Sequence, residues 1–289
     1  MTQTSSVVAG WELMIRIKQQ IADRGIKAST IQRELDIGAT YWSQLVNFKG
    51  LLTDEKLKIL MQLLEFEPDE QQELLDLRAV AKTRGWWSEY SALFDDELLR
   101  FYGMENGAQT IRSFENGVIP GLLQTEDYVR LLMKSSVTTG RPTEVEQRVR
   151  VRLARQRRLK GPDPIQLSVV MGEAALAYVV GDPLEVHAPQ LRHLQSLVET
   201  LPDTLDVRII PFTNGAGIAS LNAATFHILG FESPRLPKVG WLETAIYGEV
   251  ASDTKRVDAL DYLHNQLRSM ALSREESLQL IDQTARQIG

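Results

Sequence analysis

The hydrophobic positions in the first third of the chain recur in short blocks at helical spacing. Leu13, Ile17 and Ile21 lie four residues apart and Gly25 follows them, so this block predicts a helix that ends at the glycine. Similar blocks predict four more helices, at residues 29–37, 39–48, 53–64 and 68–84. The helices within residues 11–66 are short and closely spaced, which predicts one small helical bundle.

Three of the predicted helices begin with capping signals. Ser29 followed by Gln32, and Ser273 followed by Glu276, have the spacing of a capping box. Thr53 precedes Asp54 and Glu55, and acidic side chains in the first turn interact favourably with the positive, N-terminal end of a helix dipole. We therefore expect helices to begin directly after these three hydroxyl residues.

The helix predicted at residues 39–48 has two contrasting faces. At about 100° per residue, Trp42, Leu45 and Val46 share one side. The other side carries hydroxyl and amide side chains, namely Thr40, Ser43, Gln44 and Asn47. A short helix of this kind after a glycine-containing turn is typical of a helix-turn-helix, whose amide side chains hydrogen-bond to adenine in the major groove. The alternative interpretation is a helical subdomain with an ordinary solvated face.

The pattern stays helical from about residue 86 to about residue 160 and then changes. Alternating segments predict four strands, at residues 165–171, 207–211, 225–231 and 238–244. Helices are predicted at residues 173–180 and 189–201, and two more close the chain. The predicted fold class is α+β and mostly helical. A helix-turn-helix bundle with a linking helix occupies residues 1–84, and a mixed α/β control domain with a small sheet of about four strands occupies residues 85–289.

Residues 141–160 are strongly basic, with eight basic and two acidic side chains. Glu144 and Glu146 stand four residues before Arg148 and Arg150, which predicts two ion pairs along one helix. Three interpretations stay open: a solvated helix, a second surface for phosphates, or a surface for an acidic partner.

Three glutamates, Glu105, Glu173 and Glu243, lie beside apolar segments, which predicts that they are partly buried. A buried carboxylate needs a partner, and the arginines between residues 148 and 158 supply candidates. We interpret these carboxylates as members of structural ion pairs. Since no spacing singles out an acid–base pair and no nucleophile motif occurs, we do not expect an enzyme.

The composition excludes further classes of chemistry. The chain has no cysteine, so disulfides, thiolate nucleophiles and Cys-type zinc sites are absent, and its four scattered histidines predict no metal site. The loop at residues 214–217 lacks the third glycine of a dinucleotide motif and the Lys-Ser/Thr of a P-loop, so we expect no cofactor. No apolar run reaches the ~18 residues of a membrane span, and we expect a cytoplasmic protein without membrane contact.

The net charge of −6 is unevenly distributed along the chain. Residues 1–66 hold eight basic and seven acidic side chains, and the rest of the chain carries the excess of acid. A nucleic-acid role therefore belongs to the N-terminal part or to a local basic patch.

Several segments of the second half closely resemble one protein family. They are Gly85-Trp-Trp87, Met104-Glu105 with Ala108, and above all the segment from Val118 to Tyr128, which contains Pro-Gly-Leu-Leu-Gln-Thr-Glu-Asp-Tyr. Shorter matches follow in order at residues 152–156, 173–176, 190–194, 207–211, 226–229 and 271–277. The chain is similar, over about residues 13–285, to the actinobacterial helix-turn-helix regulators of the XRE type, often described as antitoxin-like. Their C-terminal domain of unknown function carries a PGLLQTEDYA-like signature.

This resemblance implies a transcriptional regulator with an N-terminal DNA-binding domain and a C-terminal control domain. It also implies a small partner protein encoded by a neighbouring gene. The chain departs from the family in its recognition helix, which usually reads Ser-Arg-Ile-Glu-x-Gly. Here Gln44 stands in place of the usual arginine, Val46 in place of glutamate and Phe48 in place of glycine.

We therefore expect a sequence-specific, homodimeric regulator of double-stranded DNA, whose control domain senses a small partner protein or a ligand. A dimer doubles the phosphate contacts of a weakly basic domain and sets the half-site spacing. Base edges are assigned to Thr40, Ser43, Gln44 and Asn47, and phosphates to Lys27, Arg33, Lys49, Lys56 and Lys58. The alternative is an antitoxin-like protein-interaction module with a degenerate helix-turn-helix that does not bind DNA.

Overall fold

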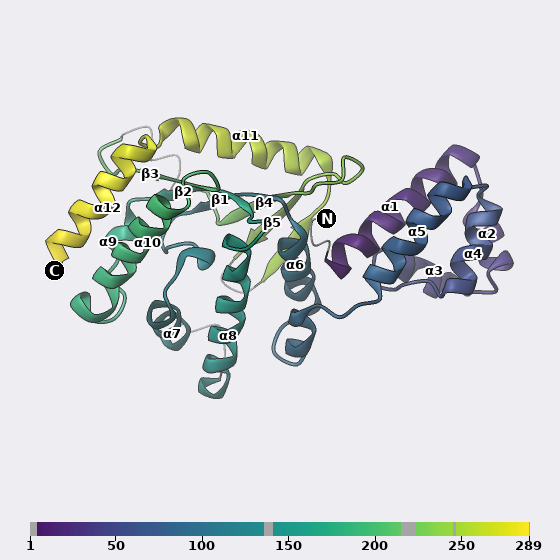
Figure 1. The fold of residues 1–289 in the computed structure, drawn as a ribbon, viewed down its shortest axis with the longest axis horizontal. Helices are drawn as coiled ribbons and strands as arrows, with labels where there is room; N and C mark the ends of the chain where they lie inside the picture. Colours follow the sequence, from purple (N-terminus) through teal and green to yellow (C-terminus); the bar gives the residue numbers. More distant parts are fainter. Residues whose placement is uncertain (1–4, 136–140, 215–222, 245–246, 289) are drawn as a thin grey trace. The chain divides into compact units, whose positions relative to one another are not determined.

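The chain folds into two units in a computed structural model, which describes residues 5–135, 141–214, 223–244 and 247–288. One unit comprises Met1–Ser91 with Ser233–Leu236, and the other comprises Ala92–Glu232 with Pro237–Gly289. The first division falls a few residues after the boundary expected at Gly85. Figure 1 shows the elements of both units, coloured along the sequence.

The N-terminal unit is a bundle of five helices around one apolar core. The helices are α1 (Ser6–Arg24), α2 (Ala28–Glu34), α3 (Ala39–Val46), α4 (Asp54–Leu63) and α5 (Pro68–Ala81). The core contains Leu13 and Ile17 of α1, Trp42 and Leu45 of α3, and Leu57 of α4, as the hydrophobic spacing predicts. Because each short helix buries one side in this shared core, tertiary packing stabilises helices that are too short to persist alone.

Local capping explains where most of these helices begin and end. Gly25 ends α1 with a left-handed φ of 64°, as predicted. The Thr53 side chain accepts a hydrogen bond of 3.3 Å from the Lys56 backbone N–H, and Ser273 and Glu276 form the reciprocal capping box. The prediction for Ser29 was wrong: α2 begins at Ala28, and Lys27 precedes it without a side-chain cap.

The C-terminal unit is built on a sheet of six strands, so the expected number of about four was too low. The strands are β1 (Thr110–Glu115), β2 (Gln166–Gly172), β3 (Leu205–Ile210), β4 (Phe226–Gly230), β5 (Val239–Glu243) and β6 (Gly248–Ala251). They lie in the order β3-β2-β1-β4-β5-β6. Strands β1, β2 and β3 pair in parallel, and β4, β5 and β6 continue the sheet in antiparallel pairing.

The two unpredicted strands have different physical reasons. Strand β1 lies within the stretch expected to be helical, and it is central in the sheet. Its buried face carries Ile111, Ser113 and Glu115, so the polar members conceal the apolar alternation that marks a strand. Strand β6 is a four-residue edge strand whose residues are mostly half-buried, and so short a segment gives little pattern.

Helices cover both faces of this sheet. They are α6 (Asp96–Gly107), α7 (Glu126–Ser135), α8 (Val145–Arg155), α9 (Ala174–Ala177), α10 (Ala188–Thr200), α11 (Thr254–Met270) and α12 (Arg274–Ile288). Short 3-10 segments span Trp86–Tyr90, Gly121–Leu123, Pro142–Glu144 and Gln156–Leu159, and a π-helical turn spans Pro183–His187. Helix α9 is shorter than the helix expected at residues 173–180 because Tyr178 takes an extended conformation.

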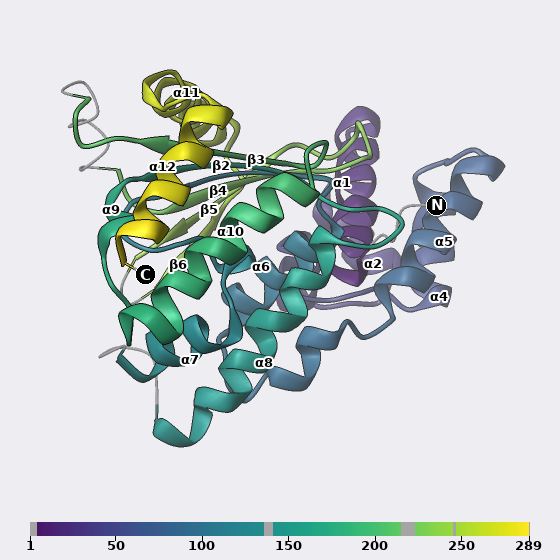
Figure 2. The same ribbon diagram turned by 60° about the vertical axis from the view of Figure 1, so that its left-hand side comes forward.

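The two faces of the sheet have different surroundings. Helix α11 runs along one face, whereas α6 and α8 lie on the other (Figures 1 and 2). Under α11, Phe114, Val170 and Phe226 of the sheet form an apolar cluster with Val257 and Leu267 of the helix. Beside this cluster, Arg112 of β1 contacts Asp261, His264 and Asn265 of α11. This apolar cluster stabilises the packing of α11 on the sheet.

In the part of the chain that the structure describes, no helix is both long enough and apolar enough to cross a membrane. The glycine loop considered as a cofactor motif includes residues 215–217, which lie outside the described residues.

Two substitutions compare the observed cap of α4, Thr53, with Ser29, a predicted cap that the structure does not show. We expect Thr53→Ala to lower the free energy of unfolding by about 1 kcal/mol, because the Lys56 N–H loses its acceptor. The matched control is Ser29→Ala, which removes an exposed hydroxyl with no capping bond and should change stability by less than about 0.5 kcal/mol. Urea unfolding of the full chain measures both, and equal losses would contradict the observed caps.

Candidate functional site

The face of α3 predicted to read DNA is exposed along its length. Trp42 and Leu45 are buried in the core of the N-terminal unit. The side chains assigned to base edges, Thr40, Ser43, Gln44 and Asn47, all lie exposed. The structure thus places the four side chains on one accessible surface of a helix that is anchored from behind.

Two of these four side chains are engaged with each other. Asn47 follows the last turn of α3, and its Nδ2 donates to the Ser43 carbonyl at 2.8 Å and to Ser43 Oγ at 3.4 Å. Gln44 and Thr40 make no side-chain hydrogen bond with any described residue. The free amide of Gln44 is therefore the side chain of this face best placed to meet an external partner.

The basic residues assigned to phosphates differ in how available their charges are. Lys27, Lys49 and Lys58 are exposed, and exposed Arg33 pairs with Glu34 at 3.3 Å. Lys56 is half-buried, and its Nζ donates to the carbonyls of Leu35 at 2.7 Å and Asp36 at 3.1 Å. Its ammonium thus satisfies carbonyls at the end of α2, a structural role that sequence spacing did not indicate.

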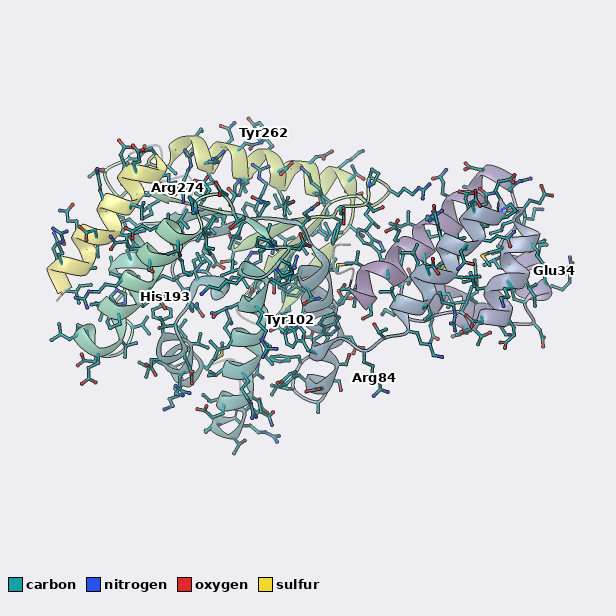
Figure 3. The ribbon with its side chains drawn as sticks, in the orientation of Figure 1. Glu34, Arg84, Tyr102, His193, Tyr262 and Arg274 are labelled. Atoms are coloured by element: carbon teal, nitrogen blue, oxygen red, sulfur yellow. The ribbon has the colours of Figure 1, made fainter. Side chains whose placement is uncertain are left out.

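The C-terminal unit contains a second candidate site, a partly enclosed cavity of about 120 Å³. Its walls come from one face of the sheet, from α6 and α8, and from the turn at Pro120–Leu122. Phe94, Phe101 and Tyr102 contribute aromatic surface, and Tyr102 is labelled in Figure 3. Ring contacts support this wall, since Phe101 stacks on Trp241 with 4.5 Å between ring centroids.

Polar side chains form two rows on the sheet side of the cavity. In the register of β1, β4 and β5, Ser113 lies beside His227, which pairs with Trp241. One step further along, Thr225 Oγ1 donates to Glu115 Oε2 at 2.9 Å, and the Glu243 N–H donates to the Thr225 carbonyl at 3.1 Å.

Burial differs among the polar side chains of these rows. Ser113 is only 1% exposed and its hydroxyl has no hydrogen-bond partner. Glu115 is 7% exposed, whereas Glu243 is exposed, contrary to the burial expected for it. The cavity thus has an acidic side that runs from a buried carboxyl group to an exposed one.

The helix side of the cavity is basic. Arg148, Arg152 and Arg155 of α8 line it at spacings of four and three residues, which places them on one side of the helix. Arg155 forms a bidentate ion pair with Glu105 of α6, with both nitrogen–oxygen distances 2.7 Å and both residues buried. This contact confirms the prediction that an arginine of the basic segment partners a buried glutamate.

Two other expectations for the basic segment had different outcomes. Arg148 pairs with Glu144 at 3.0 Å, as predicted. Glu146 pairs instead with Arg130 of α7 at 3.0 Å, so the predicted partner Arg150 was wrong. The solvated-helix interpretation fails for the three arginines that face the cavity, and their four-then-three spacing is the signal that sequence reasoning missed.

Arg152 is the unpaired cation of this wall. It makes no hydrogen bond or ion pair with another described residue, although its guanidinium faces the cavity. A Cβ on Gly121 would overlap Arg152 Nη1, so the glycine leaves the space that the guanidinium occupies. Burial, followed by the neighbouring charge of Arg155, lowers the pKa of Arg152.

Side-chain amides hold the turn that carries Gly121. Gln124 Nε2 donates to the Ile119 carbonyl at 2.6 Å, and Gln156 Nε2 donates to the Gln124 carbonyl at 2.7 Å. The fully buried Gln190 accepts from the Thr125 N–H at 2.6 Å and donates to the Leu123 carbonyl at 2.9 Å. The segment that carried the family resemblance is therefore a rigid edge of the cavity.

Burial changes the titration of two groups in the cavity. It raises the pKa of Glu115 to about 7, with a second contribution from the negative charge of Glu243. It lowers the pKa of His227 to about 4. Near neutral pH His227 is therefore uncharged, and Glu115 exchanges its proton within the physiological range.

The fold and the cavity define a two-unit protein with a helical bundle and an α+β domain built around a polar pocket. The family model described as a domain of unknown function (DUF5753) matches residues 98–283, and the chain belongs to this family. Comparison with curated proteins and with solved structures gave no match. Within the described ranges, no group of three or more His, Asp and Glu side chains has a metal-binding arrangement.

Glu115→Gln tests the cost of a carboxylate on the buried side of the cavity. Since the folded pKa of Glu115 lies above the 4.5 of an ordinary glutamate, the protein loses stability as pH rises from about 4.5 through about 7. The full loss is about 3 kcal/mol at 1.36 kcal/mol per pKa unit. The glutamine variant has no carboxyl group to ionise and avoids this loss. Its stability relative to the parent chain should therefore increase as the pH is raised from about 5 to about 8.

Urea unfolding of the full chain at the two pH values measures this gain. His227 stays neutral in both folded proteins over this range and does not contribute to the difference. A constant offset between the variant and the parent at both pH values would show that Glu115 does not titrate as described.

The contribution of the buried ion pair between Arg155 and Glu105 can be tested by removing one charge or both. Glu105→Gln leaves a buried guanidinium without its countercharge and should lower the free energy of unfolding by about 3–5 kcal/mol. The double change Glu105→Leu with Arg155→Met removes both charges and should cost less than the single change. Unfolding free energies of the parent and the two variants decide it, and a double variant that is no more stable than Glu105→Gln would argue against a coupled pair.

Proposed function

We propose that the protein is a sequence-specific DNA-binding transcriptional regulator of the XRE helix-turn-helix type. In this proposal the N-terminal unit binds double-stranded DNA as a homodimer. The C-terminal unit is a control domain that responds to a ligand or to a small partner protein, and no catalytic role is assigned. The observation that carries the proposal is α3, which is buried on one side and exposes hydroxyl and amide side chains on the other.

The geometry of the preceding turn supports the assignment. Helices α2 and α3 are joined by a four-residue connection, Leu35–Gly38, in which Asp36 takes a left-handed φ of 46°. Ile31 of α2 and Leu45 of α3 are both fully buried in the core of the unit. The bonds from Lys56 to the end of α2 further fix this turn, so α3 is held as a rigid element, which base readout requires.

The chemistry of the exposed face favours adenine. A glutamine amide donates and accepts at once, which matches N7 and N6 of adenine in the major groove. Exposed Lys49 lies three residues after the last residue of α3, and its backbone N–H donates to the Gln44 carbonyl at 2.8 Å. A cation at this end of the helix fits a nearby phosphate, while Gln44 faces a base.

A second candidate function is a protein-interaction module that does not bind DNA. It is favoured by the engagement of Asn47 with Ser43 and of Lys56 with α2, because both leave fewer groups free for DNA. The near balance of basic and acidic side chains in residues 1–66 points the same way. This alternative assigns the same surface of α3 to a protein partner.

Gln44→Ala distinguishes the two functions. After selection of the preferred site from genomic fragments, we expect the variant to lose ~1–3 kcal/mol of binding to that site and to relax the preference at one base pair. Binding to random DNA should be unchanged, since Gln44 makes no phosphate contact in the proposal. The matched control is Gln62→Ala, which removes an exposed glutamine of α4.

Fluorescence anisotropy at several salt concentrations provides the affinities. Equal losses on selected and random DNA would show that Gln44 does not read sequence. Failure of the unmodified chain to enrich any fragment, with the neighbour-encoded protein present as well as absent, would favour the interaction module.

A further inference from the structure

The cavity of the C-terminal unit contains more polar groups than its internal contacts use. Arg155 is neutralised by Glu105, and Arg148 by Glu144. Arg152, by contrast, lines the cavity together with Glu115 and Glu243 and has no ion pair to either carboxyl group. A half-buried cation that shares a cavity with one buried and one exposed carboxyl group, without an ion pair to either, leaves room for a bridging molecule.

The hydroxyl of Ser113 gives an independent indication of a ligand. It belongs to a central strand, is almost completely buried and lacks a hydrogen-bond partner. Buried polar groups are nearly always satisfied, so such an orphan at the wall of a cavity marks a position where a bound group completes the bonding.

We propose that this cavity binds a small zwitterion of the amino-acid class, with its carboxylate on Arg152 and its ammonium group between Glu115 and Glu243. The forked donors of a guanidinium match a carboxylate in a bidentate manner. An ammonium group offers three donors, which suits a position bounded by two carboxyl groups and a hydroxyl. Each charge of the ligand thus meets the opposite charge on its side of the cavity.

The remaining walls suit a short apolar side chain on this ligand. Phe94, Leu98, Leu122 and Met133 line the cavity beside the polar groups. A cavity of roughly 150 Å³ admits a molecule the size of benzene, so the 120 Å³ observed here fits a small amino acid with a short side chain and excludes a peptide. The raised pKa of Glu115 agrees with the proposal, since a cation between the two carboxyl groups lets both ionise.

The site deepens the proposed function by giving the control domain an effector class, but its binding chemistry does not depend on DNA. The first measurement is the thermal stability of the full chain with each proteinogenic L-amino acid, followed by calorimetric titration of those that stabilise it. The best amino acid is then compared with its deaminated and decarboxylated analogues. We expect each analogue to bind at least about tenfold more weakly, since each lacks one charged contact.

Variants at the two ends of the site separate a binding role from a structural one. Arg152→Gln should abolish the amino-acid response and at the same time raise the melting temperature of the unliganded chain, because it removes a half-buried cation that has no ion pair. Gly121→Ala keeps the charge but places a methyl group where the guanidinium lies, and it should weaken binding at least about tenfold. The control is Arg150→Gln, an exposed arginine of the same helix, which should leave the response intact.

The inference is wrong if no amino acid stabilises the chain, or if Arg152→Gln retains the full response. Equal binding of the deaminated analogue would replace the proposal by a simple anion site, and equal binding of the decarboxylated analogue would replace it by an amine site. All of these measurements exclude DNA. A negative result therefore leaves the Gln44 test intact, and a failure of that test leaves amino-acid binding intact.

Discussion

The buried ion pair between Arg155 and Glu105 sets the geometry of the C-terminal unit. Neither charge is stable at its depth without the other, so the pair ties α8 to α6 at a defined rotation of each helix. The same rotation turns Arg152 and Arg148 toward the sheet, because they lie one and two turns before Arg155. The ion pair thus fixes the rotation of α8, and this rotation places the unpaired cation of Arg152 in the cavity.

Strand β1 places different kinds of side chain on the two faces of the sheet. The face under α11 is packed with aromatic and aliphatic side chains, including Phe114 and Phe226. The opposite face of the same strand carries Ser113 and Glu115 in place of apolar residues. Since polar burial contributes little net stability and leaves a hydroxyl unsatisfied, apolar contacts elsewhere in the domain have to stabilise it while these polar positions hold a site.

The two units differ in how far their sequences predict their structures. In the N-terminal unit the deciding signals are local: apolar spacing, the glycine after α1 and the hydroxyl of Thr53 all act within a few residues. Even there the predicted cap at Ser29 failed, because the chain begins α2 with Ala28 and leaves that serine exposed. Local signals therefore identify helices more reliably than they identify their first residues.

In the C-terminal unit the missing information is non-local. Strand β1 did not resemble a strand because Ser113 and Glu115 occupy buried positions, and what makes Glu115 tolerable there is Thr225, which lies 110 residues away in the chain. Likewise Arg155 resembles a solvated helical residue until Glu105, 50 residues earlier, is placed against it. A pattern-based prediction classifies each position by its own polarity, so it fails where a polar residue is buried with a distant partner.

The segment Pro120–Tyr128 shows how a recognisable motif can point to a site without revealing it. Its resemblance to a family signature predicted a domain but no chemistry. In the structure Gly121 has no side chain because the guanidinium of Arg152 occupies that space, and the neighbouring backbone is held by the amides of Gln124 and Gln190. These constraints place a rigid turn beside an unpaired cation, and rigidity of this kind is what a binding site requires of its supporting residues. The physical content of the motif is therefore the shape of the cavity wall, which becomes visible only when α8 is packed against it.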